Sequence, residues 1–198
     1  MTWPPVFDGI GALFVRCDND PDVQAERIPG LTWVSPKLNG SDITDPASIE
    51  AWMTRMRARG LKVGGWVWCA GPPTADVAAW QPYAAQLLDH VIYDVESPYK
   101  ADEGGHYEWA DELVAAHNAH APLMPAAVTS YGAYKDTIDF GSFAEAGWPI
   151  FAQVYDSFSS GDETSYFPVY PPAGIHQLRR SLSLYPRQAV YRPESIDG

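Results

Sequence analysis

Short apolar segments that alternate with helix-like segments constrain the fold of this chain more than any other feature. The apolar segments are strand-sized and cover residues 11–17, 31–35, 62–69, 90–96, 123–130 and 149–156. Most of them are separated by stretches with the length and periodicity of a helix. Strands that are connected by helices pair in parallel, because each helix returns the chain to the edge where the previous strand began. The alternation therefore predicts an α/β fold with a parallel sheet.

The first predicted helix has a well-defined start and end. Asp45 precedes Pro46, and this pair supplies an N-capping carboxylate followed by a residue whose φ already suits the first helical turn. Gly60 is placed to end the helix. Further helices are predicted over residues 74–88 and 105–119. The apolar positions of the first helix recur every three or four residues, which predicts one buried face made of Ile49, Trp52, Met53 and Met56.

The C-terminal end of the chain has two interpretations. In the first, residues 175–182 form a helix and residues 187–191 form a final strand; in the second, the whole end consists of strands. We favour the helix. Either interpretation brings the total to about seven strands, which suits a small or incomplete (β/α) TIM-like barrel better than an open doubly wound sheet. A chain of 198 residues is long enough for one domain, so we expect residues 1–198 to form a single barrel domain.

Charge and cysteine content exclude several classes of protein. The chain has 13 Lys+Arg and 25 Asp+Glu, a formal charge of −12, and this argues against binding to nucleic acid or to an anionic membrane. The longest apolar segments are far shorter than the roughly 20 residues that span a bilayer. Two cysteines do not make a disulfide framework, so we expect Cys17 and Cys69 to be buried thiols.

Two carboxylates lie at the end of the fourth predicted strand. Side chains alternate between the faces of a strand, so Ile92, Asp94 and Glu96 share one face. The Cα atoms of Asp94 and Glu96 would be roughly 6–7 Å apart. At the carboxyl end of a barrel strand such a pair suits glycoside hydrolysis, in which one carboxyl protonates the leaving oxygen and the other attacks or stabilises the sugar. A strand end whose carboxylates only cap a helix or pair with a lysine is the structural alternative.

Aromatic and amide side chains are predicted to surround this pair. Such groups bind sugar rings when they line a groove together with a few polar atoms. The same aromatic residues also suit a core, and we expect this for one of the two tryptophans. The candidate binding residues lie at or near the ends of the third, fifth and sixth predicted strands: Trp66, Trp68, Tyr131, Gln153 and Tyr155.

The segments Gly64–Ala70 (Gly-Gly-Trp-Val-Trp-Cys-Ala) and Val91–Glu96 (Val-Ile-Tyr-Asp-Val-Glu) resemble strands three and four of glycoside hydrolase family 25, the Chalaropsis-type lysozymes. The resemblance is close over residues 60–100 and looser over the element order of residues 10–156. It implies an irregular (β/α) barrel and cleavage of the peptidoglycan backbone by an N-acetylmuramidase. It also implies that Glu96 is the catalytic acid and Asp94 the assisting carboxylate.

The chain departs from that family at both ends. The family carries an Asp inside its first strand, in a Gly-x-Asp-x-Ser pattern, whereas residues 11–15 here read Gly-Ala-Leu-Phe-Val. Asp18, just beyond the strand, is the nearest acid and a candidate third catalytic carboxylate. The family also has an Asp on its last strand, where this chain offers only Glu194 and Asp197. These departures support an alternative function, a non-catalytic tail or glycan-binding module that retains the barrel.

We predict neither a metal nor another cofactor. His117 and His120 have a spacing that is compatible with a metal, but two histidines at a helix end are more simply explained by the helix dipole. No phosphate-binding loop, nucleophile elbow or zinc-finger spacing occurs in the sequence.

The expected function is that of a glycosidase acting on bacterial cell-wall glycan, either as a phage lysin or as a tail-associated enzyme. The N-terminal residues lack a basic segment followed by an apolar one, so we predict no signal peptide. We therefore expect synthesis in the host cytoplasm, followed by incorporation into a virion or release to the wall. The expected partners are wall glycan and other virion tail proteins.

Overall fold

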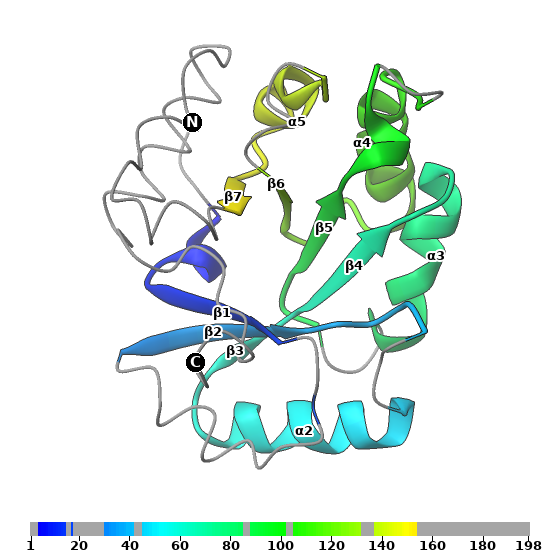
Figure 1. Ribbon diagram of the computed structural model, residues 1–198. Coiled ribbons are helices and arrows are strands. Elements are labelled where there is room, and N and C mark those ends of the chain that lie inside the picture. Colours follow the sequence, from blue (N-terminus) through cyan, green and yellow to red (C-terminus); the bar gives the residue numbers. More distant parts are fainter. Residues whose placement is uncertain are drawn as a thin grey trace, which may run out of the picture.

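The structure is a computed structural model that describes residues 4–14, 17, 30–41, 45–84, 88–101, 105–131 and 137–153 (Figure 1). For residues 10, 84, 131, 152 and 153 only the backbone is described. The predicted site residues Asp18 and Tyr155 lie outside these ranges, as do the predicted C-terminal helix and final strand.

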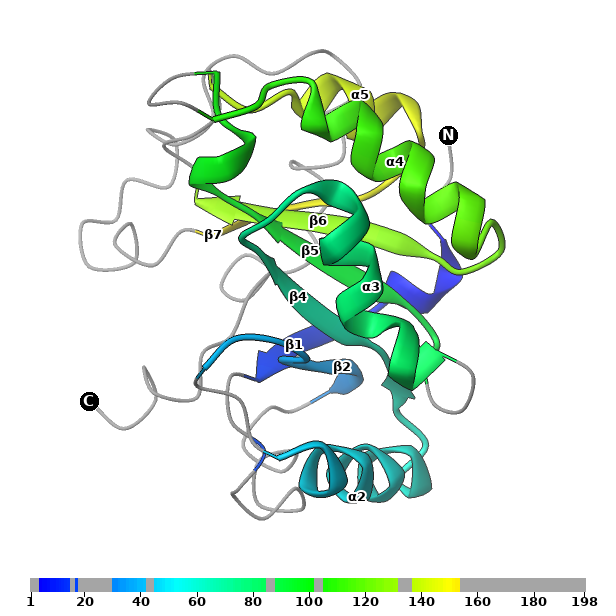
Figure 2. The same cartoon turned by 90° about the vertical axis from the view of Figure 1, so that its right-hand side faces the viewer.

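Strands and helices alternate along the described part of the chain (Figures 1 and 2). The strands are β1 (Ile10–Phe14), β2 (Leu31–Pro36), β3 (Lys62–Val63), β4 (Gly65–Cys69), β5 (Val91–Val95), β6 (Ala126–Tyr131) and β7 (Ile150–Gln153). The α-helices are α2 (Pro46–Ala58), α3 (Pro73–Ala84), α4 (Trp109–His120) and α5 (Phe140–Glu145). Two short 3-10 helices, η1 (Pro5–Phe7) and η2 (Ser97–Tyr99), precede β1 and follow β5.

All the strand pairs are parallel, in the orders β1-β2-β3 and β4-β5-β6-β7. The predicted strand over residues 62–69 is therefore divided at Gly64. Its two halves still connect the sheets, because Gly64 N donates to Val34 O at 2.9 Å and Leu38 N donates to Trp66 O at 2.9 Å. The result is one curved parallel array with helices outside, which confirms the predicted α/β fold and the small or incomplete barrel (Figure 2).

Helix α2 follows the sequence signals closely. The Asp45 carboxylate accepts hydrogen bonds from the backbone N–H groups of Ala47 and Ser48, each at 3.1 Å, so it caps the helix as predicted. The helix ends at Ala58, and Gly60 has φ 84°, a conformation that favours glycine. The predicted apolar face is confirmed, since Ile49, Trp52, Met53 and Met56 are all buried.

The strands separate two hydrophobic cores. The outer core lies between the strands and the helices. The inner core fills the barrel interior, where Trp33 of β2 packs against Phe7 and Phe151 with ring centroids 5.6 Å away in each case. Nearly every strand contributes to this inner core, which consists of Phe7, Leu13, Trp33, Trp66, Ile92, Ala127 and Phe151. The interior is thus packed with side chains rather than hollow.

Some predicted boundaries were wrong. Helix α4 begins at Trp109 rather than at residue 105, and β6 begins at Ala126 because a turn precedes it, in which Leu123 is 95% exposed. No helix was predicted between residues 130 and 149, yet α5 forms there with Asp139 as its cap. Six residues are too few to show helical periodicity.

Cys17 and Cys69 are buried free thiols, as predicted. None of the described helices combines the length and the apolar character that crossing a bilayer requires.

Gly64 is expected to tolerate no side chain. A Cβ on this residue would lie 2.3 Å from the His90 ring and 2.5 Å from the His90 backbone oxygen. Gly64→Ala should therefore lower the free energy of unfolding by about 1–3 kcal/mol, measured by urea denaturation. Gly71→Ala is the matched control, because its Cβ would lie 3.6 Å from Ala75 Cβ, an ordinary contact. Equal losses of unfolding free energy in Gly64→Ala and Gly71→Ala would contradict this steric explanation.

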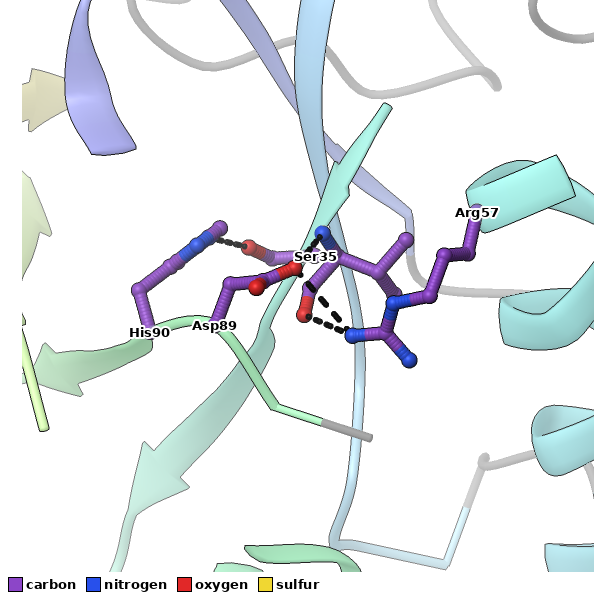
Figure 3. Close-up of polar contacts among 5 residues, drawn as sticks. Ser35, Arg57, Asp89 and His90 are labelled. Atoms are coloured by element: carbon purple, nitrogen blue, oxygen red, sulfur yellow. Dashed lines mark hydrogen bonds and ion pairs between the residues drawn. The ribbon is translucent and has the colours of Figure 1, made fainter. Parts of the chain in front are cut away.

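Polar contacts secure the amino-terminal end of β5 (Figure 3). The Asp89 carboxylate accepts hydrogen bonds from Val63 N at 2.8 Å and from Arg57 Nη2 at 3.1 Å, which ties β5 to β3 and α2. Inside the barrel, Ser35 Oγ and His90 Nε2 are 2.7 Å apart. Sequence analysis did not identify this Ser–His pair. Both residues are fully buried, so in this conformation the pair has no access to a substrate.

The buried imidazole of His90 makes stability depend on pH. Loss of hydration lowers the pKa of His90 to about 3, well below the ordinary value of 6.5. The unfolded chain therefore binds a proton that the folded chain excludes, and stability falls as the pH falls from about 6.5 to about 3. For a shift of this size the loss at pH 5 is about 2 kcal/mol.

The measurement is chemical denaturation at pH 7 and pH 5, compared between the wild type and His90→Gln. We expect the variant to lose most of this pH dependence. His106→Gln is the control, because it makes the same change at a side chain that is 48% exposed. If the stability of His90→Gln depended on pH as strongly as that of the wild type, the attribution of this pH dependence to His90 would be wrong.

Candidate active site

A cavity of about 270 Å³ opens at the carboxyl ends of β2, β4 and β5. In parallel (β/α) barrels this end of the strands is where active sites form. Backbone and side chains from all three strand ends line the cavity: Lys37, Gly40, Ser41, Trp66, Trp68, Asp94 and Glu96.

The two predicted carboxylates both line this cavity. Asp94 lies in β5, where it is paired in register with Trp68 of β4 and Thr129 of β6. It is 3% exposed, whereas Glu96, one residue beyond the strand, is partly exposed. The alternation of the strand thus brings both side chains to the interior face, as predicted.

The two tryptophans of β4 have different roles. Trp66 is 5% exposed, belongs to the inner core and donates from Nε1 to Phe14 O at 3.1 Å. Trp68 is 40% exposed, and its Nε1 donates to Glu96 Oε2 in a long hydrogen bond of 3.4 Å. The sequence predicted that one of the pair would serve as core, and the structure identifies it as Trp66.

The segment after β2 supplies two site residues that sequence analysis missed. Asn39 holds the backbone of Trp68 through hydrogen bonds to its N and O atoms, each 2.8 Å long. Lys37 is 9% exposed, and its Nζ lies 5.1 Å from the Trp66 ring centroid and 5.9 Å from that of Trp68. The signal that could have identified them is their position directly after the second predicted strand, at the end of the strands where barrel active sites form.

Lys37 gives the cavity a mixed charge. Its ammonium group lies near two indole faces, an arrangement that stabilises a partly desolvated cation. The same cavity is lined by two carboxyl groups, those of Asp94 and Glu96. It therefore combines an acid pair, one cation and an exposed aromatic surface.

The remaining predicted binding residues are only partly described. Tyr131 and Gln153 are paired in register at the carboxyl ends of β6 and β7, but their side chains are outside the described part of the structure. Asp18 and Tyr155 lie wholly outside the described residues. Their roles in the site remain predictions.

The helix-dipole explanation proposed for His117 is wrong. This residue is buried and contacts Tyr93 Oη at 3.0 Å through Nδ1 and Met124 O at 2.9 Å through Nε2. Burial lowers the pKa of His117, so the neutral ring of a core histidine is favoured over a charged partner of the dipole. Among the described residues, no three His, Cys, Asp or Glu side chains form a group that could hold a metal ion.

Comparisons with known proteins bear on the fold. The sequence matches no protein-family model and no curated protein. Among solved structures, the chain is similar to a muramidase from Acremonium alcalophilum, with a TM-score of 0.55 and 12% identity over 81% of this chain and 80% of that one. Concanavalin B aligns with a TM-score of 0.49 and 12% identity over 94% of this chain and 79% of that one. The likeness to the muramidase shows that this chain has a fold of the same kind, the α/β barrel that the sequence predicted.

Proposed function

We propose that this protein is a glycoside hydrolase that cleaves the glycan backbone of bacterial peptidoglycan, in the manner of a muramidase. The observation that carries the proposal is the convergence of Asp94, Glu96 and the exposed Trp68 on one cavity at the carboxyl ends of parallel strands. The muramidase fold of the structural neighbour and the resemblance of residues 60–100 to glycoside hydrolase family 25 support it.

Glu96 is proposed as the general acid that protonates the leaving glycosidic oxygen. It is the more exposed of the two carboxyls, so an incoming glycan reaches it first. Trp68 Nε1 holds one of its oxygens, which leaves the other oxygen for the substrate. Asp94 lies deeper and is proposed to stabilise the positive charge that develops on the sugar ring in the transition state.

Trp68 is proposed as the surface on which a sugar ring stacks. An indole that is 40% exposed beside two carboxyl groups offers the apolar face that pyranose rings pack against. Asn39 fixes the backbone of Trp68 and so limits the freedom of this surface.

The test is hydrolysis of purified cell walls from several bacterial species. We expect loss of turbidity together with new reducing ends, and mass spectrometry should place those ends on N-acetylmuramic acid. Reducing ends on N-acetylglucosamine alone would overturn the muramidase assignment but would still show that the protein is a glycosidase. The proposal that a phage lysin or tail protein carries this domain is tested separately, by whether its gene lies beside holin or tail genes.

A glycan-binding module without hydrolysis is the second candidate function. The observation that favours it is Leu13, which stands where the family pattern has its first-strand Asp and is buried in the inner core. Retention of the protein on walls without release of reducing ends would support this module over the enzyme.

A further inference from the structure

A second carboxylate, Asp76, lies behind the site and is not used by the proposed chemistry. It belongs to the first turn of α3 and is 3% exposed. Tyr99 Oη donates to Asp76 Oδ2 at 2.7 Å, and the backbone N–H groups of Ala70 and Gly71 lie close enough to this carboxyl to lower its pKa. Burial raises the pKa of Asp76, and the Tyr99 hydrogen bond opposes that rise.

The groups around Asp76 come from two segments that leave the site strands. Residues 69–71 directly follow Trp68 at the end of β4. Tyr99 ends η2, the turn after β5, and its backbone N–H donates to Glu96 O at 2.9 Å. Asp76 therefore connects the segment after Trp68 with the segment after Glu96, on the side of the strands opposite the cavity.

The energetic cost of burying a carboxylate restrains the segments that Asp76 connects. A buried charge is tolerated only while hydrogen-bond donors surround it, and each lost donor leaves part of the charge without compensation. If the segment after β5 moved away from α3, Asp76 would lose the hydrogen bond from Tyr99. The two strand ends are thereby restrained together, and with them the 3.4 Å contact between Trp68 Nε1 and Glu96 Oε2.

We infer that Asp76 is a positioning residue that fixes Trp68 and Glu96 relative to each other through the segments that follow β4 and β5. Its consequence for catalysis rests on the proposed function, whereas its effect on the Trp68–Glu96 contact does not. The two claims are tested separately.

The structural test is nuclear magnetic resonance of the ¹⁵N-labelled full chain. Eight tryptophans give eight indole N–H signals, and the Trp68→Phe variant identifies the signal of Trp68. In the wild type this indole N–H donates to Glu96 Oε2, so its chemical shift reports the contact. In Asp76→Asn and in Tyr99→Phe we expect the signal to move toward the position of an indole N–H that is exposed to water.

Tyr93→Phe is the matched control. Tyr93 is also a buried tyrosine of this layer, but its hydroxyl contacts Trp80 Nε1 at 2.6 Å and His117 Nδ1 at 3.0 Å rather than the strand-end segments. It should lose stability and keep the Trp68 indole signal at its wild-type position. If Asp76→Asn and Tyr99→Phe also keep the signal at that position, Asp76 contributes to stability alone and the inference is wrong. Tyr99→Phe decides the matter if Asp76→Asn does not fold, because it removes only one hydroxyl.

The catalytic consequence is read from wall hydrolysis. If the chain is a hydrolase, Tyr99→Phe should lower kcat by roughly 10- to 100-fold with little change in KM, because a displaced acid slows the chemical step rather than binding. A wild type without hydrolysis would refute the proposed function and leave the resonance test intact. An active wild type with an unchanged kcat in Tyr99→Phe would refute the positioning role in catalysis.

Discussion

Replacing Glu96 by glutamine is expected to lower kcat for wall hydrolysis by about 10²- to 10⁴-fold, the usual contribution of a general acid. Glutamine keeps the shape of the side chain and still accepts a hydrogen bond from Trp68 Nε1, but it has no proton to give to the leaving oxygen. KM and the unfolding temperature should therefore change little. Initial rates of reducing-end release, together with thermal denaturation of the same preparations, measure both effects.

Two further variants show whether the loss belongs to the site. Asp94→Asn should also lower kcat severely, because it removes the charge that stabilises the developing cation. Glu112→Gln, an exposed carboxyl of α4, makes the same chemical change away from the cavity and should leave the rate unchanged. Full activity in Glu96→Gln would remove this residue from the mechanism.

Replacing Trp33 by alanine is expected to cost about 3–5 kcal/mol of folding free energy, the range for large aromatic side chains in a core. Trp33 is 2% exposed and packs against Phe7, His90 and Phe151, so its loss opens a void in the centre of the barrel. Urea denaturation at pH 7 measures the loss. A variant that does not fold at all under native conditions would agree with the same prediction.

Trp68→Ala makes the same substitution at an exposed position. Because Trp68 is 40% exposed, the change should cost no more than about 1 kcal/mol of stability. Its cost should appear instead in binding, as a roughly 3- to 10-fold weaker affinity for wall oligosaccharides, measured by calorimetry. If Trp33→Ala cost less folding free energy than Trp68→Ala, the assignment of Trp33 to an inner core would be wrong.

The pattern of the sequence by itself determined the architecture. Periods of two and of three to four residues report which face of an element is apolar, and this information is local. It was therefore sufficient for the alternation of strands and helices, for the capped helix α2 and for the common face of Asp94 and Glu96. Where the elements were too short for a period, as in α5, the prediction failed.

Tertiary structure decided which residues share the site and how they are held. Periodicity does not distinguish Trp66 from Trp68, because both point to the same face; the difference arises from how far each lies along the barrel axis. Lys37 joins the cavity, and Asn39 and Asp76 support it, through contacts between segments that are distant in sequence. Such contacts depend on the register between neighbouring strands, and a local sequence pattern does not specify that register.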